Sequence, residues 1–452
     1  MFHAVPSWFL RSDVISGVGF SPNQTYRRDG YRNTDHELED QSFHFRIDDN
    51  ICLYGVFDGH CGPQAALFVK QRMPAEILLG QLDNDSTEEE VCEVLRKAFS
   101  SVEEEYFQYT IANKLAERAT LLTELPEGKD IYEGVHEFPH LRAKFEELNH
   151  AVASGTTAVV VLIFHGRIYV SNVGDSRALL CCTEGDGVLS VRQLSVDHDL
   201  NSEEELRRLQ CLNVNTSYVR RIGRLGNQSC TRCLGNYLVK GGYKEIEHLR
   251  SAISEPVIAD PEIQKGVPVD ESTRFLMLLS RGLYTAVAEA TDGKQANTQL
   301  AQMVADEFQT QTSLTGVAQA VIDKVSRMHH EHFMADPSHN VNHRDDMTLL
   351  VRNFNFPLPN SATSPVNGKT PPFPNRIPSI DMSQSTPTIV LTGSPLSTLT
   401  NTVASSTTES SDFVKDSVQQ IPLDENGRVR PYVDFSDYYK NVDTNFCSDN
   451  AS

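Results

Sequence analysis

The pattern of apolar and polar positions predicts a β-hairpin near residue 50. Three apolar residues alternate with polar ones before a polar turn, namely Phe43, Phe45 and Ile47. An apolar run over residues 51–57 follows the turn, as in a buried strand. The run ends at Asp58-Gly59-His60, so a rigid strand presents a carboxylate and an imidazole at its end. An Asp-Gly pair is also a common hairpin turn, and this stretch alone favours that simpler interpretation.

Helical and strand patterns alternate along the rest of the first 356 residues. Apolar residues at helical spacing predict helices that open at Pro63, run from Thr87 to about Leu122, and cover about 295–311 and 313–333. Short apolar runs predict strands over residues 154–163, 167–180, 275–279 and 343–351. Residues 123–150 are charged, and we expect them to form a surface hairpin or loop. The sequence therefore predicts an α+β domain.

Composition divides the chain into four parts. Residues 1–29 are irregular and predict an N-terminal extension, and residues 30–356 hold the predicted domain. Residues 357–430 are rich in Ser, Thr and Pro. Because such a segment buries too little apolar surface to offset its ordering entropy, we expect it to be a disordered linker. Residues 431–442 concentrate aromatic residues and predict a short helix.

The predicted helix over residues 431–442 carries an aromatic stripe. At about 100° per residue, five side chains fall within roughly 120° of one another. They are Tyr432, Phe435, Tyr438, Tyr439 and Val442. An uncovered aromatic face on a short segment is typical of a helix that binds in the groove of a partner protein. The alternative is that the tail folds back on its own domain.

Charge and cysteine content narrow the function classes. The formal net charge of −21 argues against nucleic acid or an acidic membrane surface as the main partner. No stretch approaches the ~20 uninterrupted apolar residues that a membrane helix needs. Nine cysteines without a disulfide framework suit a reducing compartment, and Cys230-Thr-Arg-Cys233 is only a weak metal or redox signal. We expect a soluble cytoplasmic protein, with the nucleus as the alternative compartment.

Six short motifs in order resemble the metal-dependent protein serine/threonine phosphatases of type 2C. They are Glu39-Asp40, Tyr54 to His60, Ser154 to Val161, Val173 to Arg177, Leu194 to His198 and Arg344 to Thr348. The resemblance implies an α-β-β-α sandwich, in which two antiparallel sheets are flanked by helices. It also implies a Mg²⁺ or Mn²⁺ site at one end of the sandwich.

The resemblance assigns a role to each site residue. It implies that Asp58 bridges two metal ions, that Gly59 offers its carbonyl and that Asp40 acts through water. Asp345 would be a direct ligand, Asp175 would bind a third metal and His60 would be the general acid. In such a site, a metal-bound hydroxide attacks phosphate while the histidine protonates the leaving oxygen. Arg32 is a candidate phosphate-binding residue, although it lies further from Asp40 than the family pattern places it.

Three departures from the family pattern change the predicted function. Arg281 stands where the family has an aspartate that binds metal directly, and an arginine has no acceptor for a cation. Asn236 replaces another acid of the family, and Cys61 stands where glycine is usual. We therefore expect a pseudophosphatase that requires no cofactor, with weak Mg²⁺ or Mn²⁺ binding left open by the intact Asp58-Gly59-His60. The alternative interpretation of Arg281 is drift that turns its guanidinium into solvent.

The tail extends the resemblance to a subgroup of this family. Residues 427–439 are similar to the C-terminal kinase-docking helix of pseudophosphatase scaffolds that bind the TGF-beta-activated kinase. The similarity implies that the chain binds and activates a kinase of that type, a mitogen-activated protein kinase kinase kinase. It implies kinase contacts at Tyr432, Val433, Phe435, Tyr438 and Tyr439, and a MAP kinase is a further candidate partner. Two rivals remain, namely an active Mg²⁺/Mn²⁺-dependent phosphatase and a metal- or phosphate-sensing module without a kinase partner.

Overall fold

The computed structural model describes residues 11–12, 15–48, 50–79, 82–123, 139–183, 185, 187–291, 293, 295–335 and 342–358. Apart from residues 357 and 358, the predicted linker over 357–430 lies outside these described residues, and so does the whole of the predicted helix over 431–442.

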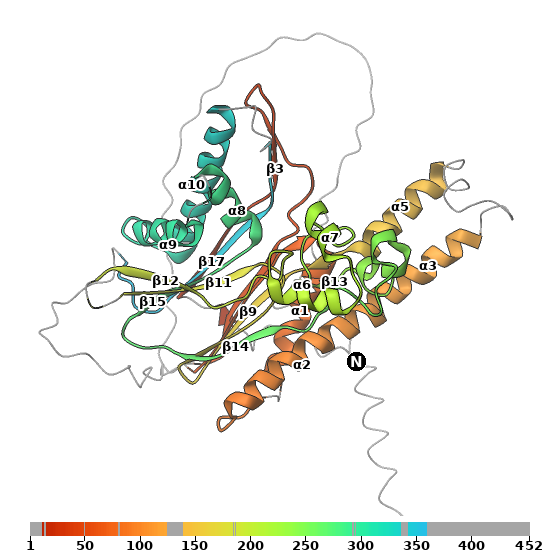
Figure 1. Ribbon diagram of the computed structural model, residues 1–452. Coiled ribbons are helices and arrows are strands. Elements are labelled where there is room, and N and C mark those ends of the chain that lie inside the picture. The colour runs from red at the N-terminus through yellow and green to blue at the C-terminus, as the bar shows by residue number, and fades with distance from the viewer. Residues whose placement is uncertain are drawn as a thin grey trace, which may run out of the picture. The chain divides into compact units, whose positions relative to one another are not determined.

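Two antiparallel sheets form the centre of the described fold (Figure 1). The six-stranded sheet has the order β1-β5-β6-β9-β10-β14. Its strands are β1 (Arg11–Ser12), β5 (Gln41–Arg46), β6 (Ile51–Phe57), β9 (Ala158–Phe164), β10 (Arg167–Val173) and β14 (Glu262–Pro268). The five-stranded sheet has the order β12-β11-β15-β17-β2. Its strands are β12 (Leu189–Gln193), β11 (Arg177–Thr183), β15 (Thr273–Leu279), β17 (Met347–Asn353) and β2 (Ser16–Ser21).

Helices cover the outer face of each sheet, which confirms the predicted α-β-β-α sandwich. The six-stranded sheet packs against α1 (Gln64–Leu78) and α2 (Glu88–Tyr106), and a core that includes Leu53, Val69 and Phe99 fills this layer. The five-stranded sheet packs against α8 (Arg281–Ala290), α9 (Ala296–Glu307) and α10 (Leu314–Ala335). A third core, which includes Tyr54 and Leu278, lies between the sheets. Burial of these three apolar layers supplies the main driving force for folding.

The predicted starts of two helices are confirmed. Pro63 occupies the N-cap of α1, and Thr87 caps α2 by accepting a hydrogen bond from the Glu90 amide while the Glu90 carboxylate binds back to Thr87. Helix α2 continues through a π-helical turn (Phe107–Ile111) into α3 (Ala112–Thr123). The surface loop expected over residues 123–150 is wrong in part, because α5 (Pro139–Ala153) begins at residue 139 and packs against α3.

The predicted N-terminal extension over residues 1–29 is also wrong in part. Strand β2 pairs with β17, so Gly17 and Gly19 belong to the five-stranded sheet. A side chain at either position would collide with the α10 backbone, with the nearest atoms 2.2 and 2.5 Å from the added carbon. The two glycines therefore allow the helix to lie directly on this edge strand. The domain begins before residue 30.

Short elements complete the described fold. A small sheet joins β7 (Gly59–His60), β8 (Gly155–Thr156) and β13 (Leu234–Gly235), and another joins β16 (His343–Arg344), β3 (Gln24–Tyr26) and β4 (Arg32–Asn33). Residues 199–260, here called the insert, carry α6 (Glu203–Cys211), α7 (Thr216–Ile222) and the 3-10 turns Tyr237–Val239, Tyr243–Glu245 and Glu247–Leu249. The insert has its own apolar core around Leu209 and Val239.

Candidate functional site

Strand register brings the predicted site residues to one end of the sandwich. Gln41 pairs with Phe57, so Asp40 and Asp58 lie beside each other at the ends of β5 and β6. Arg177 pairs with Leu279, and Leu279 pairs with Leu349. Asp175, Arg281 and Asp345 therefore sit in the connections at the same end, because each lies a few residues beyond a paired position. The motifs separated in sequence thus form one cluster, here called the carboxylate cluster and defined as Asp40, Asp58, Asp175 and Asp345.

Asp58 lies at the centre of this cluster. Its Oδ2 accepts a hydrogen bond from the Arg281 main-chain N–H at 3.0 Å. Its main-chain carbonyl accepts one from the Thr157 N–H at 2.9 Å, which fixes the turn after β6. Burial raises the pKa of Asp58 well above its ordinary value, and the nearby carboxylates of Asp40 and Asp175 raise it further. The cluster therefore holds more negative charge than its surroundings neutralise.

Asp40 shows the same excess of negative charge. Only 2% of the residue is exposed. Burial, followed by repulsion from Asp346, raises the pKa of Asp40 to about 7.

Arg281 places a fixed positive charge inside the cluster. Its Nη1 donates to the Ser229 hydroxyl at 3.0 Å, and its Nε lies 3.7 Å from Asp175 Oδ2. Burial alone would lower the pKa of Arg281, but Asp175 and the other acids nearby raise it above its ordinary value. The side chain is 41% exposed, so it is neither fully buried nor turned away into solvent. The structure therefore pairs the Arg281 side chain with Asp175 and with Ser229 of the insert.

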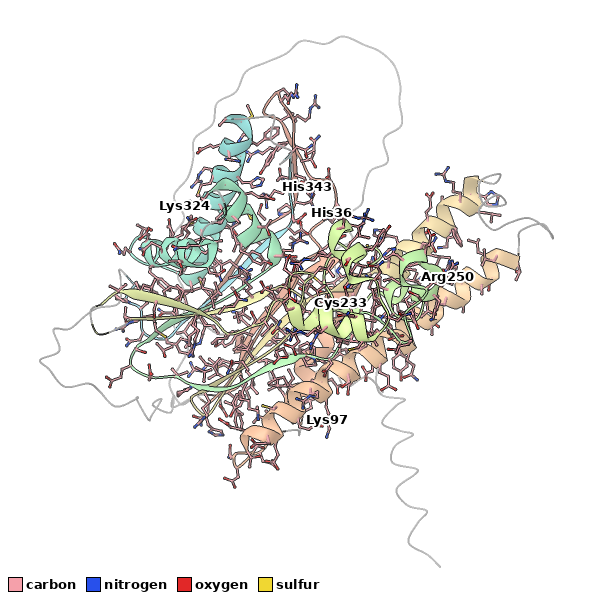
Figure 2. The ribbon with its side chains drawn as sticks, viewed as in Figure 1. His36, Lys97, Cys233, Arg250, Lys324 and His343 are labelled. Atoms are coloured by element: carbon pink, nitrogen blue, oxygen red, sulfur yellow. The ribbon has the colours of Figure 1, made fainter. Side chains whose placement is uncertain are left out.

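Asp345 lies at the rim of the cluster. Its side chain is 53% exposed, and its Oδ1 accepts a hydrogen bond from His343 Nε2 at 3.1 Å. Figure 2 shows His343 and His36 on the same side of the molecule, next to β3. Sequence reasoning missed the neighbouring Asp346, which is the buried acid of the pair. The only signal for it was the doubled aspartate.

Asp346 joins three distant segments by hydrogen bonds. Its Oδ1 accepts the Asn23 N–H at 2.6 Å, and its Oδ2 accepts the Glu39 N–H at 2.7 Å. Asn23 belongs to the predicted N-terminal extension, so that segment helps to hold Asp346 next to the carboxylate cluster. Arg32 lies in β4 and pairs with Tyr26 of the neighbouring strand β3. Its side chain is exposed, and no contact between it and the cluster is present among the described residues.

Gly59 and His60 form the edge strand β7. A side chain at Gly59 would lie 2.5 Å from the Glu39 carbonyl, so only glycine fits there. His60 Nε2 lies 3.2 Å from the Asn236 side-chain nitrogen. Burial lowers the pKa of His60 to about 4. The imidazole is therefore neutral near pH 7, whereas a general acid must carry the proton that it donates.

The two further departures also lie at this edge. Asn236 adopts a left-handed backbone conformation (φ 56°) and donates to Gln228 Oε1 at 2.6 Å, so it is bound within the insert. Cys61 has φ 55°, a conformation that glycine adopts without strain. The Cys61 thiol accepts a hydrogen bond from Asn227 at 3.5 Å, and burial raises its pKa. A thiol with a raised pKa is a poor nucleophile at neutral pH.

The donor set does not fit a pair of divalent cations as it stands. Arg281 supplies a positive charge next to Asp175, and its amide occupies one oxygen of Asp58. A second positive charge at contact distance would be repelled by several kcal/mol at an effective dielectric of about 20. Across the described ranges, no three His, Cys, Asp or Glu side chains are grouped so that they could hold a metal ion.

The predicted kinase-contacting residues lie outside the described residues. They are Tyr432, Val433, Phe435, Tyr438 and Tyr439. Among the helices that are described, none is long and apolar enough to cross a membrane.

Comparison with known proteins places this geometry in a family. The family pattern described as Protein phosphatase 2C matches residues 104–332, slightly more than half of the chain. This range contains Asp175 and Arg281, whereas Asp40, Asp58 and Asp345 lie outside it.

Individual relatives give the same result. The chain is 27% identical over 307 residues to the Caenorhabditis elegans "TGF-beta-activated kinase 1 and MAP3K7-binding protein 1", covering 66% of this chain and 71% of that protein. It is 29% identical over 275 residues to "Probable protein phosphatase 2C 2" of Paramecium tetraurelia, covering 60% of this chain and 76% of that protein.

The chain is also similar to solved structures. The structure of a serine-threonine phosphatase 2C from Toxoplasma gondii aligns with a TM-score of 0.43 at 18% identity, covering 75% of this chain and 94% of that one. The family match over residues 104–332, rather than this structural alignment, shows that the chain belongs to the protein phosphatase 2C family.

Proposed function

We propose that this chain is a catalytically inactive member of the protein phosphatase 2C family that acts as a kinase-binding scaffold in the cytoplasm. The partner is the catalytic domain of a mitogen-activated protein kinase kinase kinase of the TGF-beta-activated type, which the scaffold binds and activates through residues 431–442. The observation that carries the inactive state is Arg281 in the carboxylate cluster.

Arg281 supports inactivity by charge and by position. Its guanidinium lies 3.7 Å from one carboxylate, and its amide donates to another. Without a divalent cation, no Lewis acid activates a water molecule or neutralises the phosphate. Burial of His60 lowers its pKa to about 4, which disfavours the protonated form that a general acid needs. A fold with such a site can still bind partner proteins, because this binding does not depend on catalysis.

The kinase part of the proposal rests on similarity. The Caenorhabditis elegans relative is named as a protein that binds TGF-beta-activated kinase 1. The aromatic stripe at Tyr432, Phe435 and Tyr439 supplies the apolar face that a helix docked in a groove requires. A MAP kinase is a second proposed partner.

A single assay tests the inactive state. The full chain is incubated with a phosphothreonine peptide in Mn²⁺, and phosphate release is compared with that of the Asp58→Ala variant. We expect the two rates to be equal and to match the buffer control. A Mn²⁺-dependent rate that Asp58→Ala abolishes would refute the proposal of inactivity.

The second candidate function is an active Mg²⁺- or Mn²⁺-dependent protein serine/threonine phosphatase. One observation favours it, which is that Asp58-Gly59-His60 is intact and lies among the other acids of the carboxylate cluster. In that case Arg281 would have to turn away from Asp175 when a cation binds. The assay above separates the two candidates, since only the phosphatase releases phosphate.

A further inference from the structure

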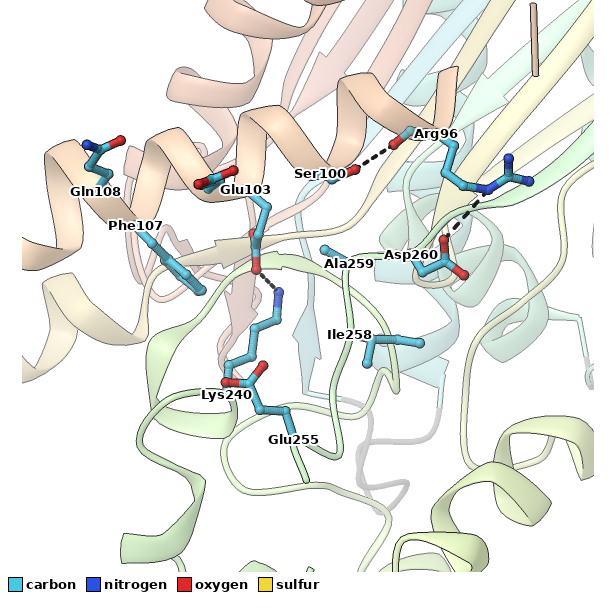
Figure 3. Close-up of a pocket in the computed structure, with 11 residues that line it drawn as sticks. Arg96, Ser100, Glu103, Phe107, Gln108, Lys240, Glu255, Ile258, Ala259 and Asp260 are labelled. Atoms are coloured by element: carbon cyan, nitrogen blue, oxygen red, sulfur yellow. Dashed lines mark hydrogen bonds and ion pairs between the residues drawn. The ribbon is translucent and has the colours of Figure 1, made fainter. Parts of the chain in front are cut away.

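A groove of about 830 Å³ lies between α2 and the insert, apart from the carboxylate cluster (Figure 3). Helix α2 forms one wall, and the segment over residues 255–260 forms the other. Three partly exposed apolar residues contribute to its lining, namely Phe107, Ile258 and Ala259. Neither the metal-site motifs nor the aromatic tail accounts for this surface.

The floor of the groove is a fixed ion pair. Lys240 is 1% exposed, and its Nζ donates to the Glu103 carboxylate and to the Cys233 carbonyl, the latter at 2.8 Å. The other Glu103 oxygen accepts the Gly235 N–H at 2.7 Å. A buried lysine is tolerated only when it is paired and hydrogen-bonded in this way. The pair therefore holds the insert against α2 and keeps the groove preformed.

The groove has more acid than base along its lining. Arg96 lies 4.0 Å from Asp260, which balances one end. Glu104 and Glu255 also line the groove, and both are exposed. Within the described residues, neither side chain makes a hydrogen bond or an ion pair. Glu255 interacts at longer range with Lys240, which is already paired with Glu103, and burial raises the pKa of Glu255. Two carboxylates without a close cation of their own, next to an apolar surface, are suited to a ligand that carries positive charge beside an apolar side chain.

We propose that this groove binds a basic linear segment of a partner protein. A Lys or Arg of the segment lies against Glu104 and Glu255, and an adjacent apolar side chain packs on Phe107 and Ile258. Charge complementarity identifies the occupant, since four acidic residues line the groove and only two basic ones do. The chain as a whole, with a net charge of −21, also attracts a basic segment at long range. The inference does not depend on the proposed kinase contact or on the state of the carboxylate cluster.

The test uses the full chain and a set of fluorescein-labelled decapeptides. Each peptide carries two Lys or Arg and two Leu or Phe residues at spacings of one to three, and a matched set carries Gln in place of each base. Binding is followed by fluorescence anisotropy at low and high salt. We expect members of the basic set to bind at least about fivefold more tightly than their matched peptides, and added salt to weaken them.

Two variants assign the binding to the groove. Glu104→Gln combined with Glu255→Gln removes both charges without a change in side-chain size, and it should weaken the basic peptides by about fivefold. Glu271→Gln is the control, because Glu271 is an exposed acid outside the groove. Its affinity should equal that of the unaltered chain. Failure of every basic peptide to bind better than its matched peptide would overturn the proposal, and so would unchanged affinity in the double variant.

Discussion

At the scale of single residues, the charge balance of the carboxylate cluster depends on one side chain, that of Arg281. Asp58 and Asp175 are buried acids whose pKa values are raised, first of all by burial. Arg281 is the positive charge that the structure places among them, and it also reaches Ser229 in the insert. It therefore does two things at once, because it offsets part of the negative charge and ties the insert to the start of α8.

We predict that Arg281→Ala destabilises the domain in metal-free buffer. The variant leaves Asp175 without its cation and Ser229 without its donor. Because the Arg281 side chain is 41% exposed and screened by water, the expected loss is only about 1 kcal/mol, or a fall in Tm of roughly 2–4 °C. Differential scanning calorimetry checks this. Arg207→Ala, which removes an exposed arginine of α6, is the control and should leave Tm unchanged. An equal Tm for both variants would show that the Arg281 contacts contribute nothing.

Sequence reasoning could identify the members of the cluster but not their partners. The resemblance to the type 2C phosphatases assigned Asp40, Asp58, Asp175 and Asp345 to the site by their motifs. The contact of Arg281 with Ser229 joins positions 52 residues apart through an insert that has no strong periodicity. No local pattern encodes such a contact.

At the scale of elements, the insert depends on a buried ion-pair network. Glu205 lies in the first turn of α6 with its side chain 2% exposed, and it accepts hydrogen bonds from Arg232 at 2.7 Å and Arg208 at 2.9 Å. Thr231 also donates to it, at 2.6 Å. Most residues of α6 are charged or polar, and this pattern alone could not show that one of its acids points inward. A buried acid on a polar helix departs from the usual binary pattern.

We predict that Glu205→Gln destabilises the domain by about 2–3 kcal/mol near neutral pH, because it leaves the buried Arg232 and the partly buried Arg208 without an anion. Burial alone would raise the pKa of Glu205. The hydrogen bonds from Arg232 and Arg208 outweigh burial and lower the pKa to about 2. A lowered pKa in the folded state means that this stabilisation is complete above the ordinary value of 4.5 and is lost as the pH falls towards 2. Urea unfolding should therefore show a gap between the two proteins at neutral pH that closes in acid, and a gap that stays constant would contradict the assignment.

The proposed tail helix gives a second prediction at this scale. We expect Phe435→Ala to weaken binding of the 425–452 peptide to the kinase catalytic domain at least about tenfold. Full burial of one Phe contributes about 1.5–3 kcal/mol, and aromatic hot spots often exceed this on truncation. Isothermal titration calorimetry is the measurement, with Ser436→Ala as the matched control that should bind normally. Equal affinity for both variants would exclude this helix as the docking element.

At the scale of the whole molecule, the layers of the sandwich could be predicted from the sequence. Every residue of β9 is buried, and strands of this kind appear in the sequence as continuous apolar runs. The flanking helices each have one apolar face. The edges were harder to predict. Strand β2 contains two glycines and only one aliphatic residue, so its pairing with β17 could not be recognised from its own pattern.

We predict that the domain and the tail act independently in binary binding. Removal of residues 1–356 should leave most of the affinity for the kinase domain intact. The reason is that we expect the linker over 357–430 to be a flexible tether, so the tail binds without help from the domain. A pull-down with this truncated chain, compared with one that lacks residues 425–452, makes the comparison directly. Loss of binding in the first chain but not in the second would place the kinase contact on the sandwich instead.

The central claim is that Arg281 has replaced a divalent cation in the carboxylate cluster. Mn²⁺ titration of the full chain, followed by electron paramagnetic resonance of the free ion, tests it most directly. If Arg281 has taken the place of the cation, we expect no saturable Mn²⁺ binding by the unaltered chain. We also expect that Arg281→Asp gains at least one site that Asp58→Ala then removes, since that change exchanges a positive for a negative charge beside Asp175. Saturable binding by the unaltered chain that Asp58→Ala abolishes would contradict the account.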